Sequence, residues 1–588
     1  MGVVEAMLIG TDRVRAGTET RVDLRLRVLE PLEAGASVRV SVPLGWTPPS
    51  LERGRGLIRW HVVGPALVLG EIVRRRYVQL NVTGGRLGPD DAVIFSYGTG
   101  TEGALAQPWV TDVPAIFEVE VSRDGNGTYV SGGTVPVVVE PGPPAYLYII
   151  APSGARLGVD LPIRIRVLDK FGNLCSSCSA QAMTTGGRAV RIEEGCGAAT
   201  VTFGQEGVYR IDAVIADLGL SGRSNPCRVA ADAPALWWGD PHVHTTLSDG
   251  VASPEFALRY GRDVACVDFT AITDHDVEYH HAWFTRRRQR LSDETWNALA
   301  ETIGRYRAAG RFAVLRAYEW TGRPYGDRCV YLRSDGTAIR RYEQDDAPTL
   351  DALWRGLKQA GPDDALVVPH TSASGFMGTD WTEHDAALET LVEVYSMHGA
   401  SECAGGPAEM AGAVQGRHVQ DALARGYRLG FAAGGDMHSS QPGNPILAFG
   451  PYRTLRYKPG LTAVFASHLD EQAIFGAMRN RRTYATTGAR ILLWFSVNDV
   501  PLGGDLVVGA GQPVVVHGCI HGTAALAEVF VVRDGAPVYV AHPLQEDFEF
   551  AWEDPHPPTA HARTYYYLRV VQVDNEVAWA SPVWVGHS

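Results

Sequence analysis

Residues 236–250 read LWWGDPHVHTTLSDG, a short apolar run that leads into two histidines and an aspartate. Apolar runs without alternation are typical of strands that are buried on both faces, as in parallel sheets. Five later runs have the same form, and an imidazole or a carboxylate directly follows each of them: 266–273, 311–318, 365–369, 391–397 and 428–435. Amphipathic stretches alternate with these runs, and one of them opens with Ser253-Pro254, a good helix N-cap followed by proline. This alternation of strand and helix predicts a parallel α/β barrel over residues 233–490.

The side chains that follow these six runs are of the kinds that bind metal ions. They are His242, His244, Asp249, His275, Glu319, His370, His398, Asp436 and His438. The carboxyl ends of the strands in a parallel barrel meet at one mouth, so we expect these side chains to lie together. Imidazole and carboxylate ligands without thiolate favour Zn, Mn or Fe over Mg or Ca. The alternative, independent core residues that are satisfied by hydrogen bonds, requires the same coincidence six times.

The segments on either side of the barrel are predicted to be all-β. Residues 1–143 consist of short alternating runs, such as TRVDLRLRVLE, that glycine and proline interrupt, which predicts an N-terminal β-sandwich. Residues 144–232 repeat this rhythm after a proline-rich linker and predict an immunoglobulin-like β-sandwich. Alternation returns over residues 491–588, which predicts a C-terminal β-domain. The sequence therefore predicts a multidomain chain of the α/β plus all-β class.

Composition excludes several classes of function. The 588 residues carry 53 basic and 66 acidic side chains, a net charge of −13, which argues against nucleic-acid binding. No run approaches the roughly 18 apolar residues that a membrane span needs, and the N-terminus lacks the pattern of a signal peptide. We therefore expect a cytoplasmic protein with neither nucleic acid nor a membrane as partner. The sequence is compatible with an oligomer but does not indicate one.

Four of the eight cysteines fall close together in the second β-segment: Cys175, Cys178, Cys196 and Cys227. The pair Cys175-Ser-Ser-Cys178 has the spacing of a zinc knuckle, so a four-cysteine zinc site is one interpretation. The later gaps are irregular and no second CxxC follows, which favours the other interpretation, small buried side chains in a reducing compartment.

Five of the motifs resemble, in order and spacing, those of the polymerase-and-histidinol-phosphatase (PHP) superfamily of metal-dependent phosphoesterases. They are GDPHVHTTLSDG, AITDHD, AYEW, VVPH and GGDMH. Further motifs, among them EVYSMHG, RRTYATTGARI and AWASPVWV, look like those of one large, poorly characterised branch. Pro241 replaces the usual leucine, which removes a backbone donor but leaves the histidine pair intact. The resemblance implies a distorted (β/α)7 PHP barrel that carries two or three divalent metal ions.

The resemblance also implies a role for each ligand. His242, His244, Glu319 and Asp436 would surround one metal ion. Glu319, His370 and His398 would hold a second, with Glu319 as the bridge, and Asp249, His275 and His438 would hold a third. Glu393 in the run EVYSMHG is an alternative to His398, and Asp274 looks like a residue that orients a ligand.

These inferences predict a metal-dependent hydrolase, a phosphoesterase in which a metal-bridging hydroxide attacks phosphorus. The resemblance thus implies a small, anionic molecule as substrate. Glu319 would be essential, and Asp249, His275 or His438 would protonate the leaving oxygen if the third site holds no metal. Arg323, Arg417 and His418 lie in or near predicted loops and could meet an anionic substrate, although a solvated loop arginine is commoner. His280, His281 and His384 are interpreted as surface histidines or as residues that support a ligand.

Two alternatives remain open at this point. The same metal ions could serve a hydrolase or lyase that acts on a non-phosphorus bond, because the ligands determine the Lewis acid and not the substrate. The chain could also be a non-catalytic binding protein whose metals are structural and whose β-sandwiches recognise a polymer or a partner. Metal-dependent turnover would distinguish either enzyme from the binding protein.

Overall fold

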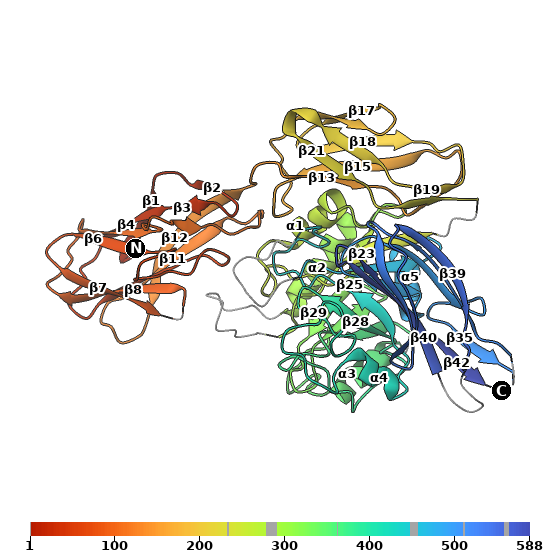
Figure 1. Cartoon of the computed structure of the whole chain (residues 1–588). Helices are drawn as coiled ribbons and strands as arrows, with labels where there is room; N and C mark the ends of the chain where they lie inside the picture. The colour runs from red at the N-terminus through yellow and green to blue at the C-terminus, as the bar shows by residue number, and fades with distance from the viewer. Residues whose placement is uncertain are drawn as a thin grey trace.

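The computed structural model describes residues 2–73, 75–231, 235–277, 291–361, 363–446, 457–509, 512–557 and 564–587. Figure 1 shows a first β-sandwich at the left, a second one at the top, and a larger body that contains the rest of the chain. Within the described ranges, no helix combines the length and the apolar character needed to cross a membrane.

The first sandwich consists of two mostly antiparallel sheets around a hydrophobic core that includes several aromatic side chains. Its inward faces follow the alternation of the sequence: in β4, Val22, Leu24 and Leu26 are buried while Arg25 is exposed. Trp46 and Phe117 pack edge to face in this core, with ring centroids 5.5 Å apart. The strands are β1 (Val4–Ile9), β4 (Val22–Val28), β9 (Ala92–Tyr97) and β6 (Ile58–Val63) in one sheet; β2 (Arg13–Arg15), β12 (Val130–Glu140), β11 (Ala115–Ser122), β5 (Ser37–Ser41), β8 (Tyr77–Gly84) and β7 (Leu67–Val73) in the other; and the short pair β3 (Glu19–Thr20) and β10 (Ala104–Leu105).

The second sandwich is smaller and lies against the central body, above α1 and β23 in Figure 1. A short 3-10 helix, η1 (Ala216–Leu218), interrupts its strands. The strands are β13 (Tyr146–Ile150), β15 (Leu161–Leu168) and β18 (Cys196–Val201); β14 (Gly154–Ala155), β22 (Cys227–Val229) and β19 (Gly207–Tyr209); and β17 (Ala189–Ile192), β16 (Ala180–Thr184), β20 (Asp212–Ile215) and β21 (Leu220–Arg223).

One large mixed sheet runs through the central body and into the C-terminal part of the chain. Its order is β27-β26-β25-β24-β23-β31-β32-β41-β40-β37-β38, and β42 and β35 continue from β40. The bounds are β23 (Leu236–Asp240), β24 (Phe269–Ile272), β25 (Ala313–Trp320), β26 (Arg328–Leu332), β27 (Ala365–Pro369), β31 (Leu461–Phe465), β32 (Thr483–Thr486), β35 (Asp505–Val508), β37 (Leu526–Arg533), β38 (Ala536–Ala541), β40 (Thr564–Gln572), β41 (Val577–Ala580) and β42 (Val583–His587).

Two smaller sheets and a few helices complete the central and C-terminal parts. The sheets contain β28 (Leu391–Ser396), β29 (Gly399–Ala400) and β30 (Gly430–Ala433), and β33 (Leu492–Val497), β34 (Val500–Pro501), β36 (Val515–His521) and β39 (Asp547–Glu553). The helices are α1 (Pro254–Arg259), which continues as the π-helical turn η2 (Tyr260–Val264), α2 (Asp293–Tyr306), α3 (Leu350–Ala360), α4 (Val419–Ala424) and α5 (Glu471–Arg479). Helix α1 begins as the sequence predicts, since the Ser253 side chain accepts a hydrogen bond from the backbone of Phe256.

The predicted (β/α)7 barrel, and with it the α/β class and the TIM-like architecture, is wrong. Strands β23, β24 and β25 pair in parallel, but β26 pairs antiparallel with both β25 and β27, and β31 is antiparallel to β23. The structure is mostly β, and the described ranges hold five α-helices of 6 to 14 residues. The connection from β25 to β26, residues 321–327, is too short for the helical crossover that a parallel pair requires.

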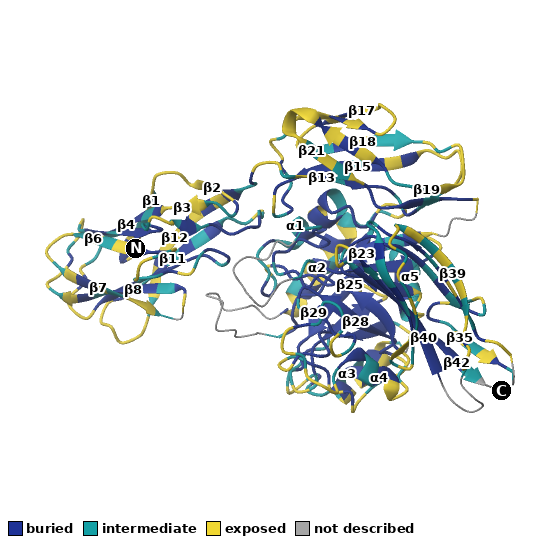
Figure 2. Cartoon of the chain, in the orientation of Figure 1, coloured by how far each residue is buried: buried dark blue, intermediate teal, exposed yellow. Residues whose placement is uncertain are grey.

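The strands that carry the predicted ligands nevertheless converge. Strands β28 and β30 pair in parallel with each other in their own sheet. A parallel bridge between Val243 and Met437 joins the chain after β23 to the chain after β30, and a second bridge joins His275 to Glu319. Figure 2 shows that β23, β25 and β28 are almost entirely buried. The ends of these strands therefore lie deep inside the central body.

Candidate metal centre

The structure brings all nine predicted metal ligands into one cluster. Each follows or belongs to a buried strand: β23 is followed by His242, His244 and Asp249, β24 by His275, β27 by His370, β28 by His398 and β30 by Asp436 and His438, while Glu319 lies within β25. Four overlapping groups of side chains in this cluster hold ligand atoms within 4.8 Å of one another. They are His244 with Asp249, His275 and His438; His242 with His244 and Asp436; His242 with His370 and Glu393; and His370 with His398 and Asp436. Convergence therefore does not depend on a barrel, because two separate sheets deliver the ligands to the same place.

The first set consists of His242, His244, Glu319 and Asp436. Oε2 of Glu319 lies 3.6 Å from Nε2 of His242 and 3.3 Å from Nε2 of His244. Oδ1 of Asp436 lies 3.5 Å and 3.0 Å from the same two nitrogens. Four ligands that each lie about 2.1 Å from one tetrahedral centre would be about 3.4 Å apart. These four atoms therefore fit around one divalent ion.

Three atoms of this set have no hydrogen-bond partner among the described residues. They are Nε2 of His242, Nε2 of His244 and Oε2 of Glu319, and all three are buried. Burying a polar atom without a partner destabilises a folded protein by about 1–3 kcal/mol, so three such atoms facing one another indicate a missing ligand. A cation is the ligand that suits a carboxylate and two imidazole nitrogens.

The second set is centred on the other oxygen of Asp436. Its Oδ2 lies 3.2 Å from Nε2 of His370 and 2.7 Å from Nε2 of His398. In the structure, Asp436 therefore contacts both the first and the second set. Glu319, which the resemblance implies as the bridge between these two, instead contacts Nδ1 of His275 at 3.2 Å.

The third set consists of Asp249, His275 and His438, with His244 beside it. Oδ2 of Asp249 lies 2.7 Å from Nε2 of His438, and its Oδ1 lies 3.7 Å from Nε2 of His275. The side chains of His438 and His398 are 16% and 22% exposed, whereas those of His242 and His244 are fully buried. The cluster is thus closed on the side of β23 and reaches solvent near His398 and His438.

Two features of the backbone allow this density of side chains. A Cβ atom on Gly434 would lie 2.5 Å from Cβ of His242, and one on Gly435 would lie 2.4 Å from a carboxylate oxygen of Asp240, so the Gly-Gly pair before Asp436 permits a close approach. Thr371 and Asp436 adopt φ angles of +44° and +52°. A β-branched residue is unusual in this region, and such strain concentrates at functional sites.

The charges of the cluster shift its pKa values in opposite directions. Burial by itself lowers the pKa of His244, but the carboxylates of Asp249, Asp436 and Glu319 raise it to about 10. Burial also lowers the pKa of His370, and here Glu393 and Asp436 raise it to about 10. Burial raises the pKa of Asp436, but His242 and His370 bring it well below its usual range. Without a cation, protons on the imidazoles balance the carboxylates.

Glu393 contacts the Nδ1 atoms of two of the imidazoles, whose Nε2 atoms face the other ligands. Its Oε1 lies 2.6 Å from Nδ1 of His370 and its Oε2 lies 3.0 Å from Nδ1 of His242. A carboxylate on Nδ1 places the imidazole proton there and directs Nε2 toward the centre. The sequence offered Glu393 as an alternative to His398, whereas the structure gives the two residues different positions.

Asp274 holds the loop between His244 and Asp249. Its oxygens accept hydrogen bonds from the backbone and hydroxyl of Thr245, at 2.7 and 2.6 Å, and from the hydroxyl of Ser248. Asp274 therefore contacts the ligand-bearing loop rather than the centre of the cluster, in line with an orienting role.

Three residues near the cluster escaped the sequence analysis. Asp240 accepts backbone hydrogen bonds from His242, Gly435 and Gly443, which joins the segments after β23 and β30. Sγ of Cys329 in β26 lies 3.3 Å from Nδ1 of His242. Asp327 is buried, its Oδ1 has no hydrogen-bond partner among the described residues, and burial raises its pKa well above the usual range. Asp240 belongs to the motif GDPHVHTTLSDG, which was its available signal. Asp327 and Cys329 reach the cluster because β26 pairs with β25, which periodicity does not reveal.

The three predicted substrate residues make different contacts in the structure. Arg323 follows β25, and its guanidinium lies 4.6 Å from the ring centroid of Phe376. Arg417 donates to the backbone oxygen of Ser374, and His418 caps α4 and lies 3.1 Å from Glu409. No contact within the described ranges joins Arg417 or His418 to the nine ligands.

Of the remaining histidines, His384 stacks on Tyr427 and lies 3.0 Å from Glu389, in a buried polar network. His280 and His281 lie outside the described residues.

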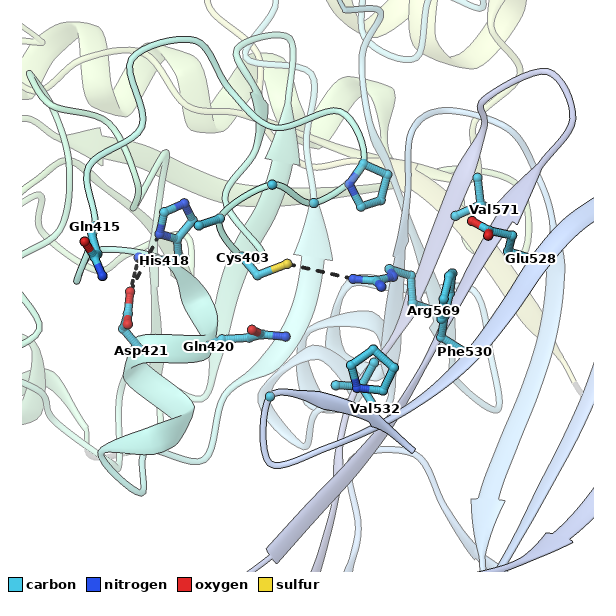
Figure 3. Close-up of a pocket in the computed structure, with 16 residues that line it drawn as sticks. Cys403, Gln415, His418, Gln420, Asp421, Glu528, Phe530, Val532, Arg569 and Val571 are labelled. Atoms are coloured by element: carbon cyan, nitrogen blue, oxygen red, sulfur yellow. Dashed lines mark hydrogen bonds and ion pairs between the residues drawn. The ribbon is translucent and has the colours of Figure 1, made fainter. Parts of the chain in front are cut away.

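His418 instead lines a cavity of about 650 Å³ between the loop after β29 and the C-terminal sheet. Figure 3 shows His418 and Asp421 on one wall, with Arg569 and Phe530 on the other. Cys403 lies between them, with its thiol 3.8 Å from Arg569. This cavity does not include any of the nine ligands.

The four clustered cysteines do not form a metal-binding group within the described ranges. All four are free thiols, and Cys175 and Cys227 are buried in the core of the second sandwich. Burial raises the pKa of each of these two thiols to about 12, which disfavours the thiolate that zinc requires.

A comparison with family models finds one described as "Protein of unknown function (DUF3604)", which matches residues 265–409 and 450–499, about one third of the chain. The matched segments include His275, Glu319, His370 and His398.

Curated relatives include an uncharacterized protein of Chlamydia pneumoniae, 27% identical over 410 residues, and one of Chlamydia trachomatis serovar D, 26% identical over 406 residues. Both matches cover 65% of this chain and 63% of the relative, so the chain spans less than two thirds of these proteins. Among solved structures, the D00-D0 domain of Intimin matches with 8% identity and a TM-score of 0.19, covering 39% of this chain and all of that one, which carries no argument about fold. The chain is thus similar to proteins without an assigned activity, and its resemblance to the PHP superfamily remains a prediction.

Proposed function

We propose that the protein is a metal-dependent hydrolase that acts on phosphoesters with two or three divalent metal ions, Zn, Mn or Fe. The observation that carries this proposal is the set of three buried atoms that face one another without a hydrogen-bond partner among the described residues, Nε2 of His242, Nε2 of His244 and Oε2 of Glu319. They belong to the cluster of nine predicted ligands, whose imidazole and carboxylate donors suit these metals.

The exposure of the cluster favours catalysis over a structural metal. Structural sites are closed by protein ligands, whereas catalytic sites keep a position open for water or substrate. The exposed edges of His398 and His438 support an opening on this side of the cluster. A substrate could reach the ions there without displacing a protein ligand.

Each group has a task in the proposed reaction. When bound, the metal ions would act as Lewis acids on a substrate oxygen and on water. Glu393 and Asp274 would keep the imidazoles and the loop after His244 in place. His275, His438 and Asp249 form the set from which a proton could pass to the leaving oxygen if no ion occupies it. Arg323 would attract an anionic substrate.

The choice of a phosphoester rests on the resemblance of the motifs and on the charge of the ions, which would balance a phosphoryl group. We also propose a cytoplasmic location, based on the composition and the free cysteines. Subcellular fractionation tests that location.

Glu319→Gln tests the proposed function. This change keeps the size of the side chain but removes the anionic oxygen that faces His242, His244 and His275. We expect loss of bound metal, measured by elemental analysis, and loss of hydrolysis of phosphomonoesters and diesters. Glu553→Gln, on the exposed end of β39, is the control and should change neither.

Three results would contradict the proposal in different ways. Full activity of Glu319→Gln with its metal intact would reject the assignment of the site. Stoichiometric metal without hydrolysis of any phosphoester would favour a reaction at another kind of bond. Metal that stabilises the fold but supports no turnover with any substrate would favour the binding protein.

A further inference from the structure

A second cavity, of about 520 Å³, lies where the second sandwich meets the central body. On the sandwich side, β13, β14 and β15 and their loops line it. On the other side, it is lined by the first residues of β23, by Asp268 before β24, and by the turn before β25. The metal ligands follow the opposite ends of these three strands, so this cavity is separate from the metal centre.

The walls of this cavity carry an excess of positive charge. Four arginines, Arg156, Arg164, Arg311 and Arg490, line it together with two carboxylates, Asp160 and Asp268. Four positive and two negative charges leave a formal excess of +2 in a chain whose net charge is −13. This local excess is therefore contrary to the charge of the whole protein.

Three of these arginines have no ion pair. The guanidinium groups of Arg156, Arg164 and Arg311 make neither a hydrogen bond nor a salt bridge with the described residues. The other contact of the same sandwich differs, because Arg210 pairs there with Asp547 at 2.8 Å and Arg223 with Glu546 at 2.6 Å. The sandwich thus neutralises its arginines at one interface and leaves them unpaired at this one.

Arg490 provides an independent sign of a missing partner. It is 6% exposed, and its Nε is buried without a hydrogen-bond partner among the described residues. Its Nη2 donates to the backbone oxygens of Ala265 and Cys266, at 3.2 and 2.8 Å, which fixes the guanidinium in place. Asp268 lines the same cavity and accepts a hydrogen bond from the backbone of Trp238, at 2.9 Å. Burial raises the pKa of Asp268, and the charges of Arg490 and Arg164 offset only part of this effect. This fixed guanidinium lines the cavity, where its charge suits an oxyanion.

We propose that this cavity binds a small multivalent oxyanion, a phosphorylated or polycarboxylated molecule, at the junction of the second sandwich and the central body. Several guanidinium groups from separate segments suit a ligand with more than one negative group, because each can form a charge-assisted hydrogen bond. Trp237 and Leu161 supply an apolar wall for the carbon part of such a ligand. The ligand would link β15 to the turn at Arg311 and so fix the sandwich against the body that holds the metal centre.

Calorimetric titration of the full chain tests this proposal, with pyrophosphate in one arm and citrate in the other. The protein is first stripped of metal so that neither anion binds through an ion. We expect one equivalent to bind, more weakly as salt increases. Arg164→Gln and Arg311→Gln should each weaken binding about tenfold or more, because each removes a charged hydrogen-bond donor. Arg191→Gln, which removes an exposed arginine paired with Glu193 on the same sandwich, should leave the affinity unchanged.

Hydrogen exchange locates the bound anion. Protection should appear in residues 150–164 and 308–312, and binding of pyrophosphate but not citrate would identify a phosphorylated ligand. Absence of binding in both arms, affinity unchanged in both arginine variants, or protection confined to residues 242–250 would overturn the proposal. Arg311 is exposed on a turn, so its variant should fold even if Arg164→Gln does not.

Discussion

Glu393→Gln should weaken metal binding without changing any of the nine predicted ligands. In the native protein, the two oxygens of Glu393 accept from Nδ1 of His370, at 2.6 Å, and Nδ1 of His242, at 3.0 Å. Glutamine has the same shape but offers one acceptor oxygen and one amide nitrogen. One of the two imidazoles would then face an N–H group, which its Nδ1 can meet only as an acceptor.

The tautomer of that imidazole determines the size of the effect. An imidazole that accepts at Nδ1 carries its proton on Nε2, the atom that faces Asp436 in both His242 and His370. A protonated Nε2 cannot bind a cation. Loss of a carboxylate behind a ligand histidine typically weakens metal binding 10- to 100-fold, or about 1.4–2.7 kcal/mol. Glu393 is buried and glutamine is isosteric, so no cavity adds to this effect.

Competition with a chromophoric chelator measures the affinity of Zn or Mn for each variant. Glu409→Gln is the matched control, since Glu409 also contacts a histidine, His418 at 3.1 Å, outside the cluster. We expect the control to bind metal like the native protein. If the metal affinity of Glu393→Gln were within twofold of that of the native protein, Glu393 would not orient these imidazoles.

Two further predictions concern pH and the fold. The pKa values of His244 and His370, about 10 in the folded metal-free protein, exceed the value near 6.5 expected in the unfolded chain, so their stabilising effect is complete below about pH 6.5 and lost as the pH rises toward 10. The denaturation midpoint of the metal-free protein should fall over this range while metal affinity rises, and a midpoint that rose would contradict the assignment. Glu402 is 1% exposed and accepts from Tyr567, Arg569 and Trp579, at 2.5, 3.0 and 2.7 Å. Glu402→Gln should lower the free energy of unfolding by about 3 kcal/mol, because Arg569 loses its buried counter-charge. Urea denaturation measures this loss, which should stay below about 1 kcal/mol for the control Glu528→Gln. An equally small loss for Glu402→Gln would show that Glu402 does not stabilise the fold as the counter-charge of Arg569.

The sequence by itself identified the residues of the candidate centre. All nine predicted ligands lie in the cluster because each lies in, or shortly after, an apolar run that becomes a buried strand, and a buried strand end can face only the interior. Local periodicity and residue type suffice for such an inference. The supporting role of Asp274 was likewise predicted, from the resemblance of the motifs to the PHP superfamily.

Only the tertiary structure decided the topology and the supporting contacts. Apolar periodicity does not reveal the direction in which strands pair. Because β26 and β31 pair antiparallel with their neighbours, the sheet is mixed and not the predicted parallel barrel. The two oxygens of Asp436 contact different sets of histidines, and Glu393 orients two imidazoles that stand 151 and 23 residues away in the chain. LWWGDPHVHTTLSDG therefore specified a buried strand followed by side chains of the kinds that bind metal ions. The partners of those side chains depend on distances between segments that the order of residues does not encode.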